Sequence, residues 1–188
     1  MIAIGVTGSL ASGKSTVTKL ISNNKHPVFN ADKVVKKLYQ NKNFTRILVT
    51  KFNLDKEKNI KKQIKNLILL DKKNLKDLEK IIHPLVRKSM FKFILKNKKK
   101  KLIVLEVPLL IESKLTKHFD SLIFVTSSKK NRLKRYKLKG GNKSFFYLLD
   151  KNQIVASRKR KYGDKVIDNN LSLKVLKKNI KDIMKNYE

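Results

Sequence analysis

Eight residues close to the amino terminus have the types and the spacing of a phosphate-binding loop. Residues 8–15 read GSLASGKS and match the pattern G-x-x-x-x-G-K-[ST]. In this pattern backbone N–H groups surround a polyphosphate, Lys14 reaches its β- and γ-phosphates, and the Ser15 hydroxyl binds Mg²⁺. The residues predicted to line the nucleotide site are Gly8, Ser9, Leu10, Ala11, Ser12, Gly13, Lys14, Ser15 and Thr16.

The sequence on either side of this phosphate loop supports a nucleotide site. Residues 2–7 (IAIGVT) predict a buried strand, and the residues from Ser15 onward predict the first turns of a helix. The positive end of that helix would favour a bound anion. The alternative is an ordinary glycine-rich turn. Because the strand and the helix stand where the motif requires them, we favour the nucleotide site.

Two carboxylates fall where predicted strands end. Asp32 follows the short apolar stretch 26–31, and Glu106 lies at the end of the apolar run 101–108. Ligands bind at the edge of an α/β sheet where the strands' carboxyl ends meet, so we expect Asp32 beside the phosphate loop. Asp32 would face a ligand or cap the following helix, and the two roles can coexist. Glu106 would hold a water of Mg²⁺, although Asp is more usual there; the alternative is a surface-loop carboxylate.

Further candidates surround Pro84. Apolar residues recur at helical spacing through residues 75–82, and Pro84 must stop, kink or restart that helix. We favour a capping role for His83 at the restarted helix over a catalytic role. Arg87 lies one turn beyond Pro84, on the side of His83, where it could bind an anionic group of a substrate.

A pair of charged helices is predicted after residue 128. Residues 129–139 form the first, the glycine pair 140–141 ends it, and a second polar helix runs from about 142 to 161. The cationic side chains on one face of the first helix are Arg132, Arg135 and Lys139. Two charged helices hinged at glycines suit a lid that closes over a triphosphate and excludes water. The alternative is a solvated helical hairpin.

The elements that must position these residues alternate between strands and helices. Further strands are predicted at 121–126 and 165–169. Residues 44–70 have helical apolar spacing without a strong strand signal, so they predict a helical insertion. Residues 171–187 predict a closing amphipathic helix. The pattern indicates an α/β domain, and 188 residues suffice for one such domain with a sizeable core.

The charge of the chain is extreme but evenly spread. The formal net charge is +33, and only six of the 47 basic residues are Arg. Such a charge ordinarily points to nucleic acid or an anionic membrane. Here the Lys residues are scattered along the whole chain, so we interpret them as a compositional bias that gives a solvated surface. Where so Lys-rich a chain keeps an Arg, we expect its planar five-donor group to be needed.

Other features bound the cellular setting. The chain has no Cys, which excludes disulfides and thiolate metal sites. It has no signal-like leader, and its apolar runs are too short to cross a bilayer. We therefore expect a soluble cytoplasmic protein with no membrane partner and no specific nucleic acid. The sequence indicates no oligomeric state.

The motifs taken together, in their order, resemble the dephospho-coenzyme A kinases over essentially the whole chain. The matching pieces are VTGSLASGKST at 6–16, ADK at 31–33, HPLVR at 83–87, VPLLIE at 107–112, RYKLKGG at 135–141, Gln153, and VIDN at 166–169. The first piece occurs in many kinases, whereas the ordered set is highly specific. Another small-molecule kinase would be expected to lack the pieces at 83–87 and 107–112. A nucleic-acid-binding protein with an ATPase core would need clustered Lys and interleaved aromatic residues.

The resemblance implies a fold and an activity. The fold is a three-layer α/β P-loop kinase with a five-stranded parallel sheet, a helical substrate-binding insertion and a helical lid. The implied single domain has its core at 1–33, 84–128 and 162–188, its insertion at about 34–83 and its lid at about 129–161. The implied reaction transfers the γ-phosphoryl group of ATP to the ribose 3′-hydroxyl of dephospho-coenzyme A, giving coenzyme A and ADP.

The resemblance also implies roles for single residues. Lys14, Asp32 and Arg135 would be catalytic, with Asp32 activating the 3′-hydroxyl and Arg135 facing the phosphates from the lid. His83 and Arg87 match the motif on the substrate side, and Asp32 also contacts the substrate. ATP would bind the phosphate loop, with Mg²⁺ at Ser15 and Glu106.

The chain departs from the family pattern at five positions. The departures are Ser9 and Ala11 in a loop usually richer in Gly, Asn30 and Glu106 where Asp is usual, and Lys139 where Arg is usual. If position 11 needs a positive φ, Ala costs on the order of 1 kcal/mol there. We expect such changes to affect the efficiency of the reaction more than its identity.

Overall fold

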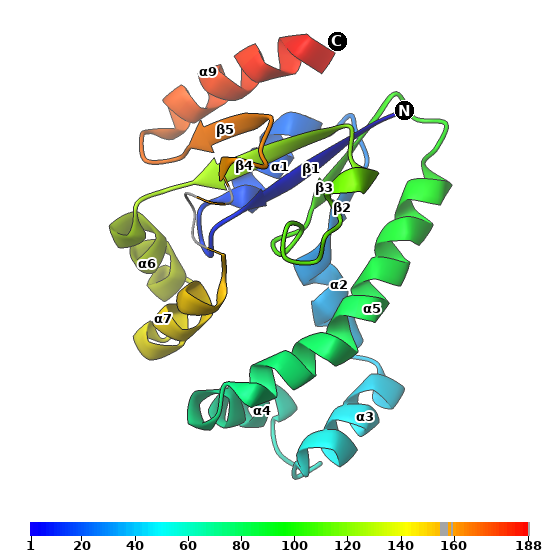
Figure 1. Ribbon diagram of the computed structural model, residues 1–188, viewed down its shortest axis with the longest axis vertical. Helices are drawn as coiled ribbons and strands as arrows, with labels where there is room; N and C mark the ends of the chain where they lie inside the picture. The colour runs from blue at the N-terminus through cyan, green and yellow to red at the C-terminus, as the bar shows by residue number, and fades with distance from the viewer. Residues whose placement is uncertain (155–157, 159, 188) are drawn as a thin grey trace. The chain divides into compact units, whose positions relative to one another are not determined.

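The computed structural model describes residues 1–154, 158 and 160–187, which alternate between strands and helices (Figure 1). The strands are β1 (Ile2–Gly8), β2 (Val28–Asn30), β3 (Leu102–Glu106), β4 (Ser121–Thr126) and β5 (Lys165–Asp168). The helices are α1 (Lys14–Ser22), α2 (Ala31–Leu38), α3 (Lys42–Phe52), α4 (Ile60–Leu70), α5 (Lys73–Lys96), α6 (Lys129–Leu138), α7 (Lys143–Asn152) and α9 (Leu173–Met184), with the 3₁₀ turns η1 (Thr116–His118) and η2 (Lys185–Tyr187).

The described strands form one parallel sheet in the order β2-β3-β1-β4-β5. In the register of the sheet, Val6 of β1 pairs with Glu106 of β3 and with Ile123 of β4. Strand β1 therefore lies between β3 and β4, and β2 lies beyond β3. Asp32 follows the three-residue β2, which lies at the edge of the sheet because the long apolar β3 takes the position next to β1. That Asp32 lies beside the phosphate loop stays a prediction.

One face of the sheet packs on α1 and α9. The inward residues alternate along each strand, as period-two geometry requires, and the helices add pairs four residues apart. This buried cluster consists of Ile4, Val6, Leu102, Val104, Ile123, Val125, Ile167, Val17, Ile21, Leu176 and Ile180. On the opposite face, a Cβ at Gly5 would lie within 3 Å of side-chain atoms of Leu110, Phe119 and Leu122, so the chain between β3 and β4 packs closely there.

The chain divides into two compact units, Met1–Asn30 with Ile94–Glu188, and Ala31–Phe93. The second unit is helical, as residues 44–70 predicted, and contains α2, α3, α4 and most of α5. Asn41 and Asn59 begin α3 and α4, where each side-chain oxygen accepts a backbone N–H three residues later. Inside this unit α3 and α4 bury pairs four residues apart: Phe44 with Leu48, and Ile64 with Ile68.

Helix α5 continues through Pro84 for 24 residues. The predictions that Pro84 stops or restarts the helix, and that His83 caps a restarted helix, are therefore wrong. Pro84 is exposed, so the carbonyl that loses its intrahelical donor can be solvated. The continuous helix puts His83 and Arg87 four residues apart, on one face, as predicted.

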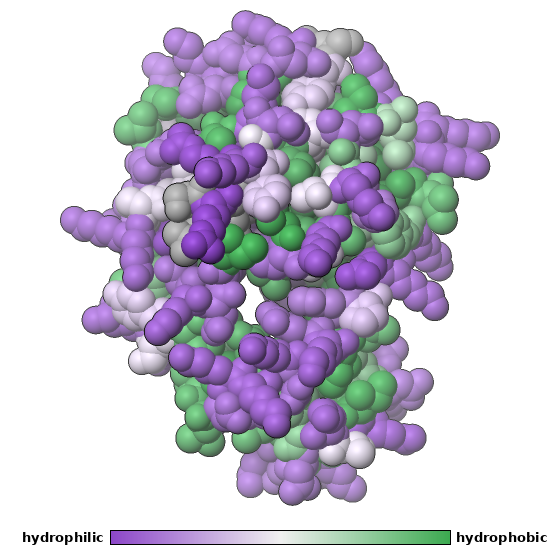
Figure 2. All heavy atoms as spheres, viewed as in Figure 1, coloured by the Kyte–Doolittle hydropathy of each residue, from purple (hydrophilic) through white to green (hydrophobic). Residues whose placement is uncertain are grey.

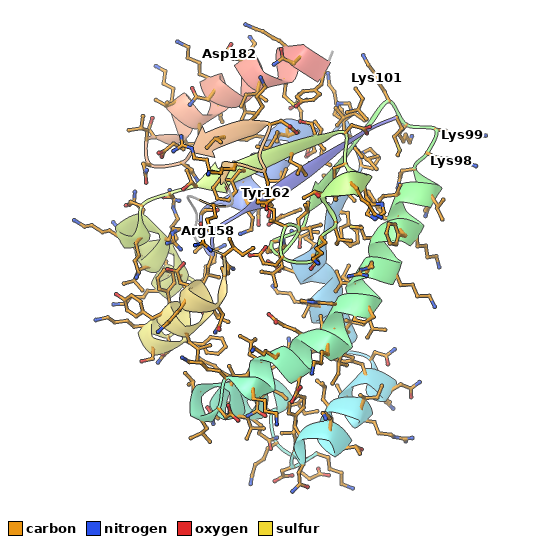
Figure 3. The ribbon with its side chains drawn as sticks, viewed as in Figure 1. Lys98, Lys99, Lys101, Arg158, Tyr162 and Asp182 are labelled. Atoms are coloured by element: carbon orange, nitrogen blue, oxygen red, sulfur yellow. The ribbon has the colours of Figure 1, made fainter. Side chains whose placement is uncertain are left out.

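Hydrophilic residues cover most of the visible surface, with apolar residues in small groups between them (Figure 2). The exposed lysines Lys98, Lys99 and Lys101 project from the turn between α5 and β3 (Figure 3). Within the described residues, no helix has both the length and the apolar character needed to cross a membrane.

Candidate active site

The phosphate loop joins β1 to α1 through two glycines that no other residue could replace without strain. Gly8 has φ 151° and Gly13 has φ 100°. A Cβ at Gly8 would lie 2.1 Å from the carbonyl oxygen of Val125, and one at Gly13 would lie 2.1 Å from Nδ2 of Asn169. The two fixed glycines of the motif thus allow β4 and the end of β5 to approach the loop closely.

Ala11 lies in the left-handed region, with φ 57°. The condition stated for position 11, a positive φ, is therefore met. A side chain with a Cβ is strained in that conformation by on the order of 1 kcal/mol. The loop therefore holds strain at a residue in the middle of the predicted nucleotide site.

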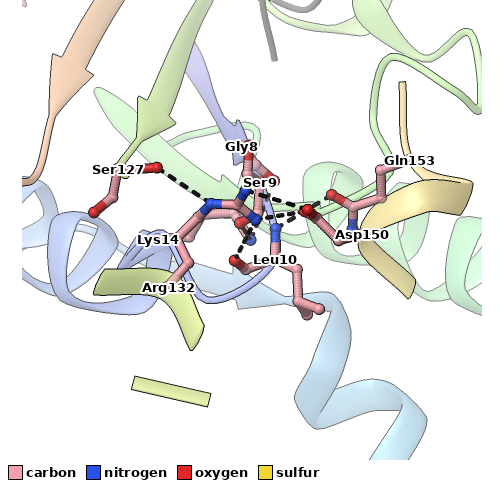
Figure 4. Close-up of polar contacts among 8 residues, drawn as sticks. All are labelled: Gly8, Ser9, Leu10, Lys14, Ser127, Arg132, Asp150 and Gln153. Atoms are coloured by element: carbon pink, nitrogen blue, oxygen red, sulfur yellow. Dashed lines mark hydrogen bonds and ion pairs between the residues drawn. The ribbon is translucent and has the colours of Figure 1, made fainter. Parts of the chain in front are cut away.

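Lys14 lies inside the curve of the loop. Its residue is 7% exposed, and its ammonium donates to the carbonyl oxygens of Gly8 (3.2 Å) and Ser9 (2.9 Å), as Figure 4 shows. Lys14 is also the first residue of α1, whose first turn contains no acidic side chain. The positive end of the helix and the ammonium therefore act together, which favours a bound anion.

Three oxygen- and nitrogen-bearing side chains meet at the neighbouring strand. The Ser15 hydroxyl donates to Oε1 of Glu106 (2.7 Å), and Nδ2 of Asn30 donates to Oε2. Glu106 is only 2% exposed, so the alternative of a surface-loop carboxylate is wrong. The hydroxyl and carboxylate oxygens are of the kind that Mg²⁺ prefers. Asn30, two residues before Asp32, fixes the orientation of this carboxylate.

Arg135 of α6 contacts the phosphate loop. Its Nη1 donates to the carbonyl oxygen of Ser12 (3.1 Å), and its Nη2 donates to that of Asn169 (2.8 Å). Nδ2 of Asn169 donates to the same Ser12 oxygen (2.8 Å). Because all these acceptors are neutral, the guanidinium charge of Arg135 remains available to an anion at the loop.

Arg132 makes a second connection between α6 and the loop (Figure 4). It donates to the carbonyl oxygens of Ser127 (3.2 Å) and Leu10 (3.3 Å) and forms an ion pair with Asp150 of α7. The N–H of Leu10 donates to Oε1 of Gln153 (3.2 Å). Arg132 and Arg135 each use several donors at once, as expected for positions where this Lys-rich chain keeps an Arg.

The glycine pair at 140–141 closes a tight turn between α6 and α7. Gly140 has φ 78°, and a Cβ at Gly141 would lie 2.2 Å from the ring of Tyr136. Phe146 of α7 is fully buried, with its ring 5.5 Å from that of Tyr136. Burial also raises the pKa of Tyr136. The helix predicted over 142–161 ends at Asn152 as α7; residues 155–157 and 159 of that prediction lie outside the described residues.

Asp32, His83 and Arg87 belong to the second unit. Asp32 is exposed in the first turn of α2, which begins at Ala31, so Asp32 lies inside the helix rather than at its cap. His83 is half-buried and Arg87 is exposed within α5. Lys139, the fifth departure from the family pattern, is exposed at the end of α6.

Asp150 and Ser127 were not predicted from the sequence as site residues, and no contact was predicted for Asn169. Asn169 was visible only as the last residue of the VIDN motif, and nothing in the sequence marked Asp150. Because acidic residues are scarce in this chain, 14 against 47 basic residues, each carboxylate is a candidate ion-pair partner for one of the rare Arg residues. That signal pointed to no particular pair.

Comparison with known proteins finds relatives that match almost the whole chain. The family model for dephospho-CoA kinase matches residues 2–174. The dephospho-CoA kinase of Fusobacterium nucleatum is 34% identical over 185 residues, which cover 96% of this chain and 95% of that protein. The structure of dephospho-CoA kinase from Campylobacter jejuni is similar with a TM-score of 0.68 at 25% identity, covering 98% of this chain and 96% of that one.

The structure of TT1252 from Thermus thermophilus is similar with a TM-score of 0.78 at 26% identity, covering 98% of this chain and 97% of that one. The family model alone spans far more than half of the 188 residues. The loop, the acidic end of β3 and the basic helix α6 all lie within the matched range. This chain belongs to the dephospho-CoA kinase family.

Proposed function

We propose that this protein transfers the γ-phosphoryl group of ATP to the ribose 3′-hydroxyl of dephospho-CoA, giving CoA and ADP in the last step of CoA biosynthesis. The observation that carries the proposal is the phosphate loop, with the buried Lys14 inside it and the Ser15–Glu106 pair beside it. Phosphoryl transfer needs little covalent help from a protein, so positioning and charge neutralisation dominate.

On the donor side, the loop N–H groups and the amino end of α1 would hold the phosphates of ATP. Lys14 would exchange its contacts with the carbonyls of Gly8 and Ser9 for the β- and γ-phosphate oxygens, which carry more charge. Arg135 would add a second cation over the transferring group, because its present acceptors are uncharged.

We propose that Ser15 and Glu106 hold Mg²⁺. When bound, the ion neutralises charge on the β- and γ-phosphate oxygens. Ser15 supplies a hydroxyl, and Glu106 supplies a buried carboxylate whose orientation is held by Asn30. The longer side chain of Glu, where Asp is more usual, reaches the Ser15 hydroxyl directly at 2.7 Å.

On the acceptor side, Asp32 would take the proton of the 3′-hydroxyl late in the transfer. Its exposed carboxylate is free of a helix-capping task, because α2 begins one residue before it. His83 and Arg87, one helical turn apart on α5, would bind anionic parts of dephospho-CoA. We further propose that the helical unit carries the substrate site and that α6 and α7 form the lid. We also propose that the protein acts in the cytoplasm and binds no specific nucleic acid.

The test is an acceptor panel. Purified protein is incubated with ATP, Mg²⁺ and separate acceptors, namely dephospho-CoA, adenosine monophosphate, shikimate and gluconate, and mass spectrometry identifies any acceptor that gains a phosphoryl group. The proposal predicts transfer to dephospho-CoA alone, and loss of transfer when EDTA removes the metal. Efficient transfer to another acceptor, with none to dephospho-CoA, would overturn it.

A further inference from the structure

A largely buried ion pair joins α6 to α7 next to the phosphate loop. It joins Arg132, which is 7% exposed, to Asp150. Both nitrogens Nη1 and Nη2 of Arg132 face the two carboxylate oxygens of Asp150. Neither residue takes part in the proposed phosphoryl transfer.

The guanidinium of Arg132 has partners in several directions. Nε donates to the carbonyl oxygen of Ser127, where β4 leads into α6, and Nη1 also donates to the carbonyl oxygen of Leu10. The ring of the fully buried Phe146 lies 5.6 Å from the guanidinium carbon, within the range of a cation–π contact. One side chain thus connects β4, the phosphate loop and α7.

Leu10 is held at both of its backbone polar groups. Its carbonyl oxygen accepts from Arg132, and its N–H donates to Gln153 at the end of α7. The next residue, Ala11, has the strained positive φ of the loop. A strained residue keeps its conformation only when its surroundings determine it, and the two contacts at Leu10 supply that restraint.

A buried ion pair adds little net stability, but removing one partner leaves the other charge unpaired and costly. Here the consequence would be local. Without the charge of Asp150, the fork of Arg132 loses the partner that orients it, and the contact with Leu10 weakens. The loop would then sample conformations in which its N–H groups no longer converge.

We propose that Arg132 is a positioning residue that holds Leu10, and through it the phosphate loop, in the nucleotide-binding conformation, and that Asp150 orients Arg132 for this task. The inference rests on the proposed function in so far as the loop binds the nucleotide. In this proposal α6, α7 and the phosphate loop stabilise one another's conformation. The glycine pair then serves as the tight turn that lets α7 pack on α6.

The test measures ADP binding by titration calorimetry, together with melting temperature and steady-state kinetics. Asp150→Asn keeps the shape and removes the charge. The exposed Asp182, paired with Lys185 on α9, provides the matched control Asp182→Asn. We expect Asp150→Asn to raise the ADP dissociation constant and the KM for ATP about tenfold, as loss of one charge-assisted contact does. The control should leave both unchanged, and neither variant should change the KM for dephospho-CoA.

A merely structural role predicts a different result. Asp150→Asn would then lower the melting temperature while its ADP dissociation constant, measured well below that temperature, stays within twofold of the parent. That result would overturn the proposal. If Asp150→Asn fails to fold, Arg132→Lys decides instead, since it keeps the charge but cannot reach Leu10, Ser127 and Asp150 together. ADP affinity within twofold of the parent in Arg132→Lys would also overturn the proposal.

The binding readout separates this inference from the proposed function. A parent protein that binds ADP but phosphorylates no dephospho-CoA contradicts the proposed function, and the comparison of ADP affinities still decides the role of Arg132. Asp150→Glu keeps the negative charge that Asp150→Asn removes, so its ADP affinity should be close to that of the parent. An Asp150→Glu variant as weak as Asp150→Asn would count against the charge of Asp150 as the cause.

Discussion

Ala is an unusual residue for position 11 of the phosphate loop, because the backbone there has a φ of 57°. A left-handed conformation strains Ala by roughly 1–2 kcal/mol, whereas Gly adopts it freely. Gly also has more freedom in the unfolded chain, which offsets about 0.4–1 kcal/mol. We predict that Ala11→Gly raises the free energy of unfolding by about 0.5–1 kcal/mol, measured by urea denaturation.

Ala31 provides the control for this substitution. It starts α2 and is not among the described residues with positive φ. Ala31→Gly should therefore lower the free energy of unfolding by about 0.5–1 kcal/mol. Equal losses of stability in both variants would show that Ala11 carries no strain.

Asp32 offers a second prediction at the scale of single residues. Asn keeps the size of Asp but cannot take a proton, so Asp32→Asn should lower kcat about 10²–10⁴-fold. Affinity for ATP should hardly change, because Asp32 belongs to the acceptor side. The removed charge in the first turn of α2 should cost only about 0.3–1 kcal/mol of stability. Turnover of a folded Asp32→Asn variant within a few-fold of the parent would end the assignment of Asp32 as the base.

The sequence predicts residues of the site well where a local motif specifies them. Gly8, Gly13 and Lys14 follow from one eight-residue pattern, and the structure explains each by a close approach or a backbone contact. The partners that arrive from distant segments could not be predicted. Asp150 meets Arg132 only because α7 folds back on α6, and a single carboxylate in a charged stretch has no signature of its own.

At the scale of elements, α5 shows how tertiary structure overrides local preference. Proline within a helix removes one hydrogen bond and costs about 3 kcal/mol relative to Ala. We predict that Pro84→Ala raises the free energy of unfolding by about 2 kcal/mol, after allowing for the greater freedom of the unfolded chain. Thermal and urea unfolding measure this change.

The comparison for Pro84 is Pro27, which lies outside the described helices, immediately before β2. Pro27→Ala should lower the free energy of unfolding by about 0.4–1 kcal/mol, since only the entropy of the unfolded chain changes. A lower melting temperature for Pro84→Ala would mean that α5 depends on the geometry that the proline imposes.

The strands themselves could be predicted from apolar runs, but their order in the sheet could not. Apolar runs 2–7 and 101–108 became the neighbours β1 and β3, separated by about a hundred residues of chain. Nothing local indicates that β3 lies between β1 and β2. This order puts Glu106, at the end of β3, next to the strand that leads into the phosphate loop, where it accepts from Ser15.

At the scale of the whole molecule, the net charge of +33 requires interpretation. If it reflects composition alone, binding to a random DNA duplex should be weak, independent of sequence and steeply dependent on salt. With about six phosphate contacts, affinity should fall by about 10³-fold between 50 and 200 mM salt. Fluorescence anisotropy measures this fall, and kinase turnover should not depend on DNA.

Tight binding to one nucleic-acid structure at physiological salt, or strong stimulation of turnover by it, would contradict this interpretation. The exposed lysines between α5 and β3 provide an internal comparison. Replacing Lys98 and Lys99 with Gln should reduce the salt dependence slightly and leave kinase activity unchanged, because neither residue belongs to the proposed active site.

In the proposed function, the phosphate loop of this protein holds ATP for transfer of its γ-phosphoryl group to dephospho-CoA. The most direct measurement is a single-turnover assay with ATP labelled at the γ-phosphate, comparing the parent with Lys14→Ala. We predict label at the 3′-position of dephospho-CoA with the parent, and none above background with a folded Lys14→Ala variant, because the buried ammonium is lost. Undiminished transfer by Lys14→Ala, or no transfer by the parent, would contradict it.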